Sequence, residues 1–315
     1  RRGRAVTGAP PVPARPQRLR AGGLDVEIGP RPWLMGIVNA SPDSFSDGGL
    51  HAGLDAQLRL AEQLLADGAS ILDVGGESAS TGRPPVAPQE EIERVAPLIE
   101  RITGELGAVV SVDTYKPQVA RAAIAAGAKL VNDVSGLRDP ALADICAETG
   151  AGLVLMHTAA APRERRQDPA LYGDVAEEVL TFLRERIELA LEHGMEREQL
   201  IVDPGPDFAK TPAQTIRLLA ASSRLAELER PILMAISRKD FIGALTGRPP
   251  RERLGGTLAA LAHGLDAGAH IFRVHDVAAA ADFLAVRAAL RGEQTPGEGL
   301  ALTEEIRYQR ARSLG

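Results

Sequence analysis

The chain has 315 residues, 44% of them hydrophobic, and a formal net charge of −6. This composition supports a large folded core, and the acidic balance argues against nucleic-acid binding, which needs a basic face. The single cysteine, Cys146, excludes an internal disulfide and is typical of a reducing compartment, so a cytoplasmic location is expected. The apolar runs fall short of the roughly 20 residues that cross a bilayer, so no membrane partner is expected.

Residues 1–30 are rich in Arg, Pro and Gly and are interpreted as a disordered tail. From residue 31 onward, short apolar runs alternate with segments whose apolar residues recur at helical spacing. Strands are predicted at residues 34–38, 70–74, 109–112, 129–131, 152–156, 200–202, 231–236 and 270–274. Helices are predicted between them, among others at residues 54–66, 90–102, 117–126, 175–192 and 254–267.

Eight strand-then-helix units over about 255 residues match the size of one α/β domain, a (β/α)8 or TIM barrel. A doubly wound open sheet is the alternative, but it normally carries a Gly-rich phosphate-binding turn after its first strand, and none is present. The barrel is therefore predicted to span residues 31–291. Residues 292–315 are interpreted as a peripheral tail with a weak helical stretch at 301–312.

Polar side chains gather where the predicted strands end, which is where barrels carry their active sites. Both asparagines of the chain are in this group. It consists of Asn39, Asp73, Glu77, Asp113, Asn132, Asp133, His157, Asp203, Ser237, Arg238, Lys239, Arg273 and His275. By contrast, Cys146 is interpreted as a core residue and residues 163–166 as a solvated loop.

The charges in this group predict the chemistry of a substrate. Asp113, Asn132, Asp203 and Lys239 mix donors and acceptors, as the edge of a flat heterocycle requires, since one carboxylate accepts two parallel N–H bonds. A separate anion-binding pole is predicted from Asn39, Arg273 and His275, because an arginine binds phosphate oxygens bidentately. An aspartate at position 43 or 47 would complete an oxygen-rich Mg²⁺ shell. The expected substrate is a polar planar ring joined to a phosphate or pyrophosphate.

The motifs then identify a family. MGIVNASPDSFSDGG, ILDVGGES, SVDTYKP, VNDVSG, LMH, DPGPDFAKT, SRKDFIG and RVHDV occur in the order found in dihydropteroate synthases, the pterin-binding barrels of folate biosynthesis. The chain resembles this family over residues 31–290. The resemblance implies a transferase reaction that joins 6-hydroxymethyl-7,8-dihydropterin pyrophosphate to p-aminobenzoate by an SN1-like, Mg²⁺-assisted route. It also implies a homodimer, since the family is commonly dimeric.

The resemblance implies roles for individual residues, with Asp113, Lys239, Arg273 and His275 as the catalytic set. The pterin would be held by Asp113, Asn132, Met156, Asp203, Phe208 and Lys239. The pyrophosphate would be held by Asn39, Arg273 and His275, with Mg²⁺ bound by Asn39 and Asp47. The p-aminobenzoate would lie among Phe45, Thr81, Arg83 and Asp240.

The chain departs from the family pattern at Pro206, Asp207 and Ala209 in DPGPDFAKT, and its second loop, GESASTGRPP, is longer. Asp240 stands where some members have a serine facing the aminobenzoate carboxylate. We expect Asp240 to cap the following helix rather than repel that carboxylate. The two aspartates, Asp207 and Asp240, leave open a non-catalytic pterin-binding paralogue. A pterin-dependent methyltransferase on the same barrel is a third possibility, but it would not need the Arg273-x-His275 pair.

Overall fold

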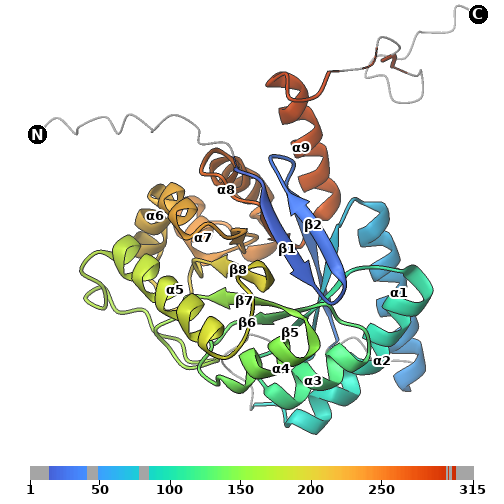
Figure 1. Cartoon of the computed structure of the whole chain (residues 1–315). Helices are drawn as coiled ribbons and strands as arrows, with labels where there is room; N and C mark the ends of the chain where they lie inside the picture. Colours follow the sequence, from blue (N-terminus) through green and yellow to red (C-terminus); the bar gives the residue numbers. More distant parts are fainter. Residues whose placement is uncertain (1–13, 41–48, 78–84, 296, 298–299, 303–315) are drawn as a thin grey trace, which may run out of the picture.

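A computed structural model describes residues 14–40, 49–77, 85–295, 297 and 300–302. Eight parallel strands form one sheet in the order β8-β7-β6-β5-β4-β3-β10-β9. A parallel bridge between Val202 and Ile232 joins the two ends of that order, so the sheet closes. The predicted barrel is confirmed, and helices surround it (Figure 1).

The element bounds agree with the predicted ranges to within a few residues. The barrel strands are β3 (Trp33–Asn39), β4 (Ile71–Gly75), β5 (Val110–Asp113), β6 (Leu130–Asp133), β7 (Gly152–Met156), β8 (Leu200–Asp203), β9 (Leu233–Met234) and β10 (Ile271–Val274). The helices are α1 (Gly49–Ala66), α2 (Pro88–Leu106), α3 (Pro117–Ala125), α4 (Ala141–Thr149), α5 (Val175–Glu192), α6 (Pro212–Ala220), α7 (Asp240–Thr246), α8 (Leu254–Asp266) and α9 (Val277–Leu290). Among the described residues, 3-10 helices lie at Arg197–Gln199, Ser222–Leu228 and Pro250–Glu252.

Alternation along the strands divides the core into two regions. One set of strand side chains, such as Leu72, Val74 and Val112, packs outward against the helices. The intervening set, such as Ile71 and Leu130, fills the barrel interior. This is the period of two that a strand imposes, with both faces buried. It explains why these strands read as continuous apolar runs in the sequence.

The amino-terminal segment corrects the sequence interpretation. Within residues 1–30, β1 (Gln17–Ala21) and β2 (Leu24–Ile28) form an antiparallel hairpin that lies across one end of the barrel (Figure 1). Leu19, Ala21 and Ile28 are fully or almost fully buried against the barrel interior. The hairpin is part of the domain because it supplies the apolar surface that covers the amino ends of the strands. Residues 1–13 lie outside the described range.

Hydrogen bonds fix the hairpin to that end. Gly22 at its turn donates to the carbonyl of Gly150 at 2.8 Å, and the Lys129 ammonium donates to the Gly22 carbonyl at 2.7 Å. His270 Nε2 lies 2.8 Å from the carbonyl of Arg15. At the other terminus, α9 ends at Leu290, and most of the helical stretch expected at 301–312 lies outside the described residues. Within the described part of the chain, every helix is too short or too polar to span a membrane.

Candidate active site

Ten of the fourteen residues to which the resemblance gives a role line one cavity at the carboxyl ends of the barrel strands, opposite the hairpin. The cavity has a volume of about 610 Å³, enough for two small substrates. The ten are Asn39, Asp113, Asn132, Met156, Asp203, Phe208, Lys239, Asp240, Arg273 and His275. Phe45, Asp47, Thr81 and Arg83 lie outside the described residues. The parallel barrel brings these side chains together from β3, β5, β6, β7, β8 and β10 and from the loops that follow β8, β9 and β10.

The floor of the cavity is a charged cluster around Arg273. Its Nε donates to Asp73 at 2.6 Å and its Nη2 donates to Asp113 at 2.8 Å. Asn132 donates to the same Asp73 oxygen at 3.1 Å. Burial alone would lower the pKa of Arg273, but Asp73 and Asp113 hold it above its usual value. The expected anion pole is therefore not separate from the ring-binding residues, because Arg273 joins them.

Asp203, Lys239 and Phe208 form a second wall of the cavity. Asp203 is almost completely buried, and its Oδ1 accepts a hydrogen bond from the Gly205 amide at 2.7 Å. Burial raises the pKa of Asp203 to about 6, although the Gly205 amide and Lys239 oppose the rise. The Lys239 ammonium lies 4.4 Å from the centre of the Phe208 ring, a cation–π distance. This wall offers a carboxylate, an ammonium and an aromatic face to a planar ligand.

His275 lies beside Ser237 at the rim. Its Nδ1 is 3.0 Å from the Ser237 hydroxyl oxygen, which also accepts from the His275 amide at 3.2 Å. Burial, followed by the charge of Arg238, lowers the pKa of His275 to about 4. The imidazole is therefore neutral at neutral pH, and the serine hydroxyl is placed to donate to Nδ1. In that tautomer Nε2 carries the proton.

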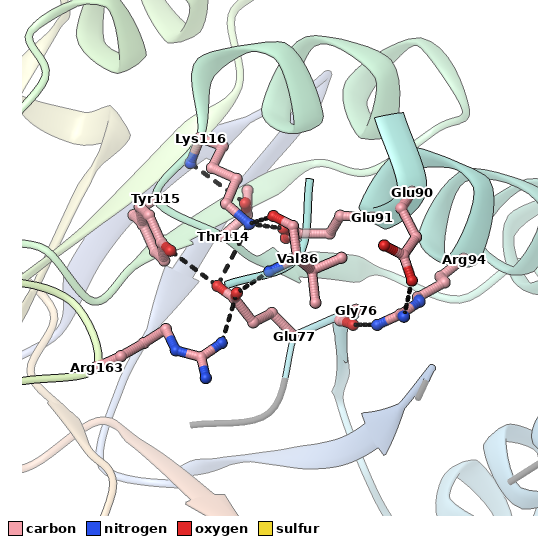
Figure 2. Close-up of polar contacts among 10 residues, drawn as sticks. All are labelled: Gly76, Glu77, Val86, Glu90, Glu91, Arg94, Thr114, Tyr115, Lys116 and Arg163. Carbon is pink, nitrogen blue, oxygen red and sulfur yellow. Dashed lines mark hydrogen bonds and ion pairs between the residues drawn. The ribbon is translucent and has the colours of Figure 1, made fainter. Parts of the chain in front are cut away.

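A second polar network joins three loops at the cavity mouth (Figure 2). Glu77, which follows β4, accepts hydrogen bonds from the Val86 amide, the Tyr115 hydroxyl and Arg163 Nη1 at 2.7–2.9 Å. Lys116 lies 3.3 Å from Glu77 and 2.5 Å from Glu91. Burial would raise the pKa of Glu77, but these donors hold it below its usual value. The network ties the loop after β7 to the segments after β4 and β5.

Arg163 is the residue that the sequence interpretation missed. Residues 163–166 line the cavity, and Glu164, Arg165 and Arg166 are exposed, as expected for a solvated loop. Arg163 differs, because only 13% of its side chain is exposed. One signal was available: residues 157–174 form an 18-residue connection at the catalytic end, and long connections are often functional. Nothing in its composition indicated that Arg163 pairs with Glu77.

Two other strand-end residues support the cavity from below. His157 is buried, and its Nδ1 lies 2.8 Å from the ammonium of Lys210, which also donates to the carbonyls of Gly205 and Phe208. Burial and Lys210 lower the pKa of His157 to about 2. Asp133 accepts from the amides of the turn that follows β6. Neither side chain lines the cavity, so both shape loops rather than meet a ligand.

Asp240 is not a helix cap, contrary to the expectation. It is the first residue of α7, and its Oδ1 pairs with Arg253 Nη1 at 3.1 Å. The carboxylate that accepts the first amides of α7 belongs to Asp207, in the loop after β8. An interloop contact of this kind leaves no trace in the local sequence around α7. The pairing with Arg253 also offsets the charge that Asp240 would present to a ligand carboxylate.

Within the described residues, no group of three or more His, Cys, Asp or Glu side chains is gathered to bind a metal ion. Mg²⁺ at a phosphate site needs only one or two protein oxygens, since phosphate and water supply the remainder. The amide side chain of Asn39, exposed at the end of β3 and lining the cavity, fits that requirement.

Comparison with known proteins identifies the family. A model of the family described as pterin binding enzyme matches residues 35–275. The dihydropteroate synthase of Bacillus subtilis is 44% identical over 245 residues, covering 78% of this chain and 83% of the relative. The dihydropteroate synthase of Escherichia coli is 39% identical over 260 residues, covering 82% of this chain and 92% of the relative.

Solved structures agree. The Xanthomonas albilineans dihydropteroate synthase with 4-aminobenzoic acid is 44% identical and has a TM-score of 0.80, covering 88% of this chain and 99% of that chain. The same enzyme in complex with 7,8-dihydropteroate is 43% identical and has a TM-score of 0.77, covering 87% of this chain and 98% of that chain. The cavity at the carboxyl ends of the strands, the matched model and these relatives together place this chain in the dihydropteroate synthase family of pterin-binding enzymes.

Proposed function

We propose that the cavity at the mouth of the barrel is where this chain carries out dihydropteroate synthesis, the activity of its family. The reaction condenses 6-hydroxymethyl-7,8-dihydropterin pyrophosphate with p-aminobenzoate and releases pyrophosphate. The observation that carries the proposal is the convergence of Asp113, Asn132, Asp203, Lys239 and Arg273 on one cavity.

The pterin ring lies between the two charged walls in this proposal. The carboxylate of Asp203 accepts from the N–H groups on one edge of the ring, and Asp113 and Asn132 serve the other edge. Lys239 donates to a ring acceptor, while Phe208 and Met156 pack against the ring face. Because Asp203 and Asn132 are almost completely buried, they read the ring in a water-poor setting where each hydrogen bond discriminates strongly.

Arg273, His275 and Asn39 bind the pyrophosphate. Only two of the N–H groups of Arg273 are used by Asp73 and Asp113, so others can meet phosphate oxygens. The Nε2 proton of His275 adds a second donor. Bound by Asn39 and Asp47, Mg²⁺ would supply charge neutralisation to the pyrophosphate.

Donors aimed at the leaving group favour a route in which the carbon–oxygen bond breaks before the arylamine attacks. Positive charge then develops on the pterin, where the carboxylates of Asp113 and Asp203 are close enough to stabilise it. The amine of p-aminobenzoate is nucleophilic when neutral, so the chain needs no strong base. The resemblance would put the second substrate near Asp240 and would assign Phe45, Thr81 and Arg83 to it as well.

Neither aspartate that suggested a non-catalytic paralogue supports that alternative. Oδ2 of Asp207 accepts amides of α7, and Asp240 pairs with Arg253. The decisive assay measures pyrophosphate release from dihydropterin pyrophosphate and Mg²⁺, with and without p-aminobenzoate. Release coupled to dihydropteroate formation is expected. Tight pterin binding without turnover would contradict the proposal and favour the paralogue.

We also propose a homodimer in the cytoplasm. Leu245 of α7, Leu254 of α8, and Val286 and Leu290 of α9 expose large apolar side chains, which a second copy would cover. Cys146 is buried, and burial raises the pKa of its thiol to about 12, so it is an unreactive core thiol suited to a reducing compartment. Sedimentation velocity at micromolar concentration tests the dimer, and a monomer there would contradict it.

A further inference from the structure

The loop after β8 holds an aspartate in a conformation that favours glycine. Asp207 has a φ of +66°, and Ala209, two residues later, has a φ of +51°. An L residue with a side chain is strained in this region, and only Asp and Asn adopt it with modest cost. The strain at Asp207 persists only if its side chain makes compensating contacts.

Those contacts cross to the next active-site loop. Oδ2 of Asp207 accepts hydrogen bonds from the amides of Asp240 at 2.5 Å and Phe241 at 3.4 Å. The N-cap residue of α7, Lys239, makes no side-chain capping bond of its own. The Asp207 amide donates to the Thr215 hydroxyl of α6 at 3.1 Å. Asp207 therefore joins α6 to the first turn of α7.

Lys239 stands at the point that this contact fixes. It directly precedes the two amides that Asp207 binds, and its ammonium lies 4.4 Å from the centre of the Phe208 ring. Phe208 directly follows Asp207 in the chain. The contact therefore fixes the distance between the Lys239 ammonium and the Phe208 ring, which lie together on one wall of the cavity. The negative charge of Asp207 also favours the ammonium form of Lys239, against the effect of burial, which lowers its pKa.

We infer that Asp207 is a positioning residue for pterin binding. By capping α7 from the neighbouring loop, it holds Lys239 against Phe208 in the cavity wall proposed to bind the pterin. The inference rests on the proposed role of the cavity. Asp207 need not touch the pterin, since its effect passes through the backbone of residues 239–241. Its carboxylate also does for α7 what a local Ser or Asp cap does for other helices.

The test compares the affinity for 6-hydroxymethylpterin, measured by calorimetry, across four single variants of the full chain and the double variant Asp207→Gly/Lys239→Met. Asp207→Gly relieves the strained φ and removes the cap, so we expect Kd to rise about fivefold to tenfold while the melting temperature changes little, because the two effects on stability oppose each other. Asp207→Asn keeps an acceptor oxygen in a residue that tolerates this φ, so we expect Kd within about twofold of the parent. Glu229→Gly relieves a positive φ of +54° away from both the cavity and the cap, and is the control that should leave Kd unchanged.

Lys239→Met separates the inference from the proposed function. We expect it to weaken pterin binding by itself and to abolish most of the further loss caused by Asp207→Gly, because the cap acts through this lysine. An equal loss from Asp207→Gly in both backgrounds would overturn the inference, as would unchanged binding in Asp207→Gly or a failure of Asp207→Asn to retain it. Undiminished pterin binding in Lys239→Met alone would instead refute the proposed role of Lys239 in binding the pterin. The inference about Asp207 would then fail with it.

Discussion

Asp203 links the acidity of the cavity to ligand binding. It is 2% exposed, and burial raises its pKa to about 6. A pterin edge presents adjacent N–H donors, and only the ionised carboxylate can accept from two of them, because the protonated acid turns one oxygen into an O–H donor. We expect the affinity for 6-hydroxymethylpterin to fall by up to about tenfold per pH unit below pH 6. It should level off only above about pH 8, because the pKa of Asp113, on the other edge of the ring, is raised to about 7. Calorimetric titrations from about pH 5 to about pH 8.5 measure this.

The sign of the linked stability change distinguishes this effect from acid unfolding. Because the folded pKa of Asp203 lies above its unfolded value, burying it as an anion costs stability above about pH 6, and that cost disappears as the pH falls toward 4. Protonation of Asp203 therefore does not lower the free energy of unfolding in the acidic range where pterin binding is lost. Asp203→Asn should bind weakly across the range, and its remaining slope would belong to Asp113, whose pKa is also raised. Equal slopes in the parent and the variant would exclude Asp203 as the titrating group.

Arg273 has both a binding and a structural role. Arg273→Ala should weaken pyrophosphate binding by about 2–3 kcal/mol, as expected for charged hydrogen bonds. It should also lower the free energy of unfolding by about 3 kcal/mol, since Asp73 is fully buried and would lose its cation. Calorimetry and denaturant unfolding separate the two effects.

The double variant Arg273→Ala/Asp73→Asn is the control. Neutralising Asp73 removes the unpaired charge, so stability should recover while pyrophosphate binding stays weak. Recovery of both properties would show that the arginine serves only the fold. Recovery of neither would place the lost stability elsewhere than in the pair that Arg273 makes with Asp73.

At the scale of elements, the loop after β7 depends on the pairing of Arg163 with Glu77 (Figure 2). Both side chains are largely buried, at 13% and 7% exposure, so the pair is worth more than a surface ion pair. Arg163→Ala should increase amide hydrogen exchange across residues 157–174 and raise KM for p-aminobenzoate several-fold, with pterin affinity unchanged. Exchange mass spectrometry and steady-state kinetics measure these effects.

Arg165→Ala is the matched control because Arg165 is exposed on the same loop and makes no ion pair within the described part of the chain. It should leave exchange in the loop at the parent level. If both variants loosen the loop equally, the effect comes from lost positive charge rather than from the contact with Glu77. If neither does, the other bonds of the loop are sufficient to hold it.

The elements also show what the sequence predicts well. Buried parallel strands give apolar runs of four or five residues, and β7 and α5 have the predicted bounds. The strand ends predict the cavity because parallel strands in a barrel all finish at one end. The contacts of Arg163 with Glu77 and of Asp207 with α7 were not predictable, since each joins loops that are distant in sequence and depends on side-chain reach rather than on periodicity.

At the scale of the whole molecule, the hairpin was missed although its signal was present. Gly22 and Gly23 have positive φ and separate two short runs with alternating burial, LRA and LDVEI. A Gly-Gly pair between alternating segments is a two-residue hairpin signature. The Arg- and Pro-rich composition of residues 1–16 obscured it. Composition averaged over residues 1–30 mixes the Arg- and Pro-rich segment with the hairpin, whereas the turn of the hairpin is specified by a few residues.

The hairpin and the cavity occupy opposite ends of the barrel, and this division predicts that stability and activity can be changed separately. Leu19 of β1 is fully buried in the cluster that includes Met35 and Ile71. Leu19→Ala should lower the free energy of unfolding by about 2–5 kcal/mol, the range for a buried leucine. Below the melting temperature, kcat and KM should stay near parent values, because Leu19 lies at the hairpin end of this cluster, whereas the cluster meets the cavity at Ala235.

Arg18→Ala is the control on the adjacent position. The Arg18 side chain is 60% exposed and, within the residues that the structure describes, forms an ion pair only with Asp25 across the hairpin. Its removal should therefore cost less than about 1 kcal/mol. Urea unfolding of both variants, with kinetics at 25 °C, provides the comparison. Equal losses would mean that the hairpin frays from the barrel and that its buried face contributes little. A fall in kcat for Leu19→Ala without unfolding would mean that packing at the end covered by the hairpin affects the residues at the carboxyl ends of the strands. The two ends of the barrel would then be energetically coupled.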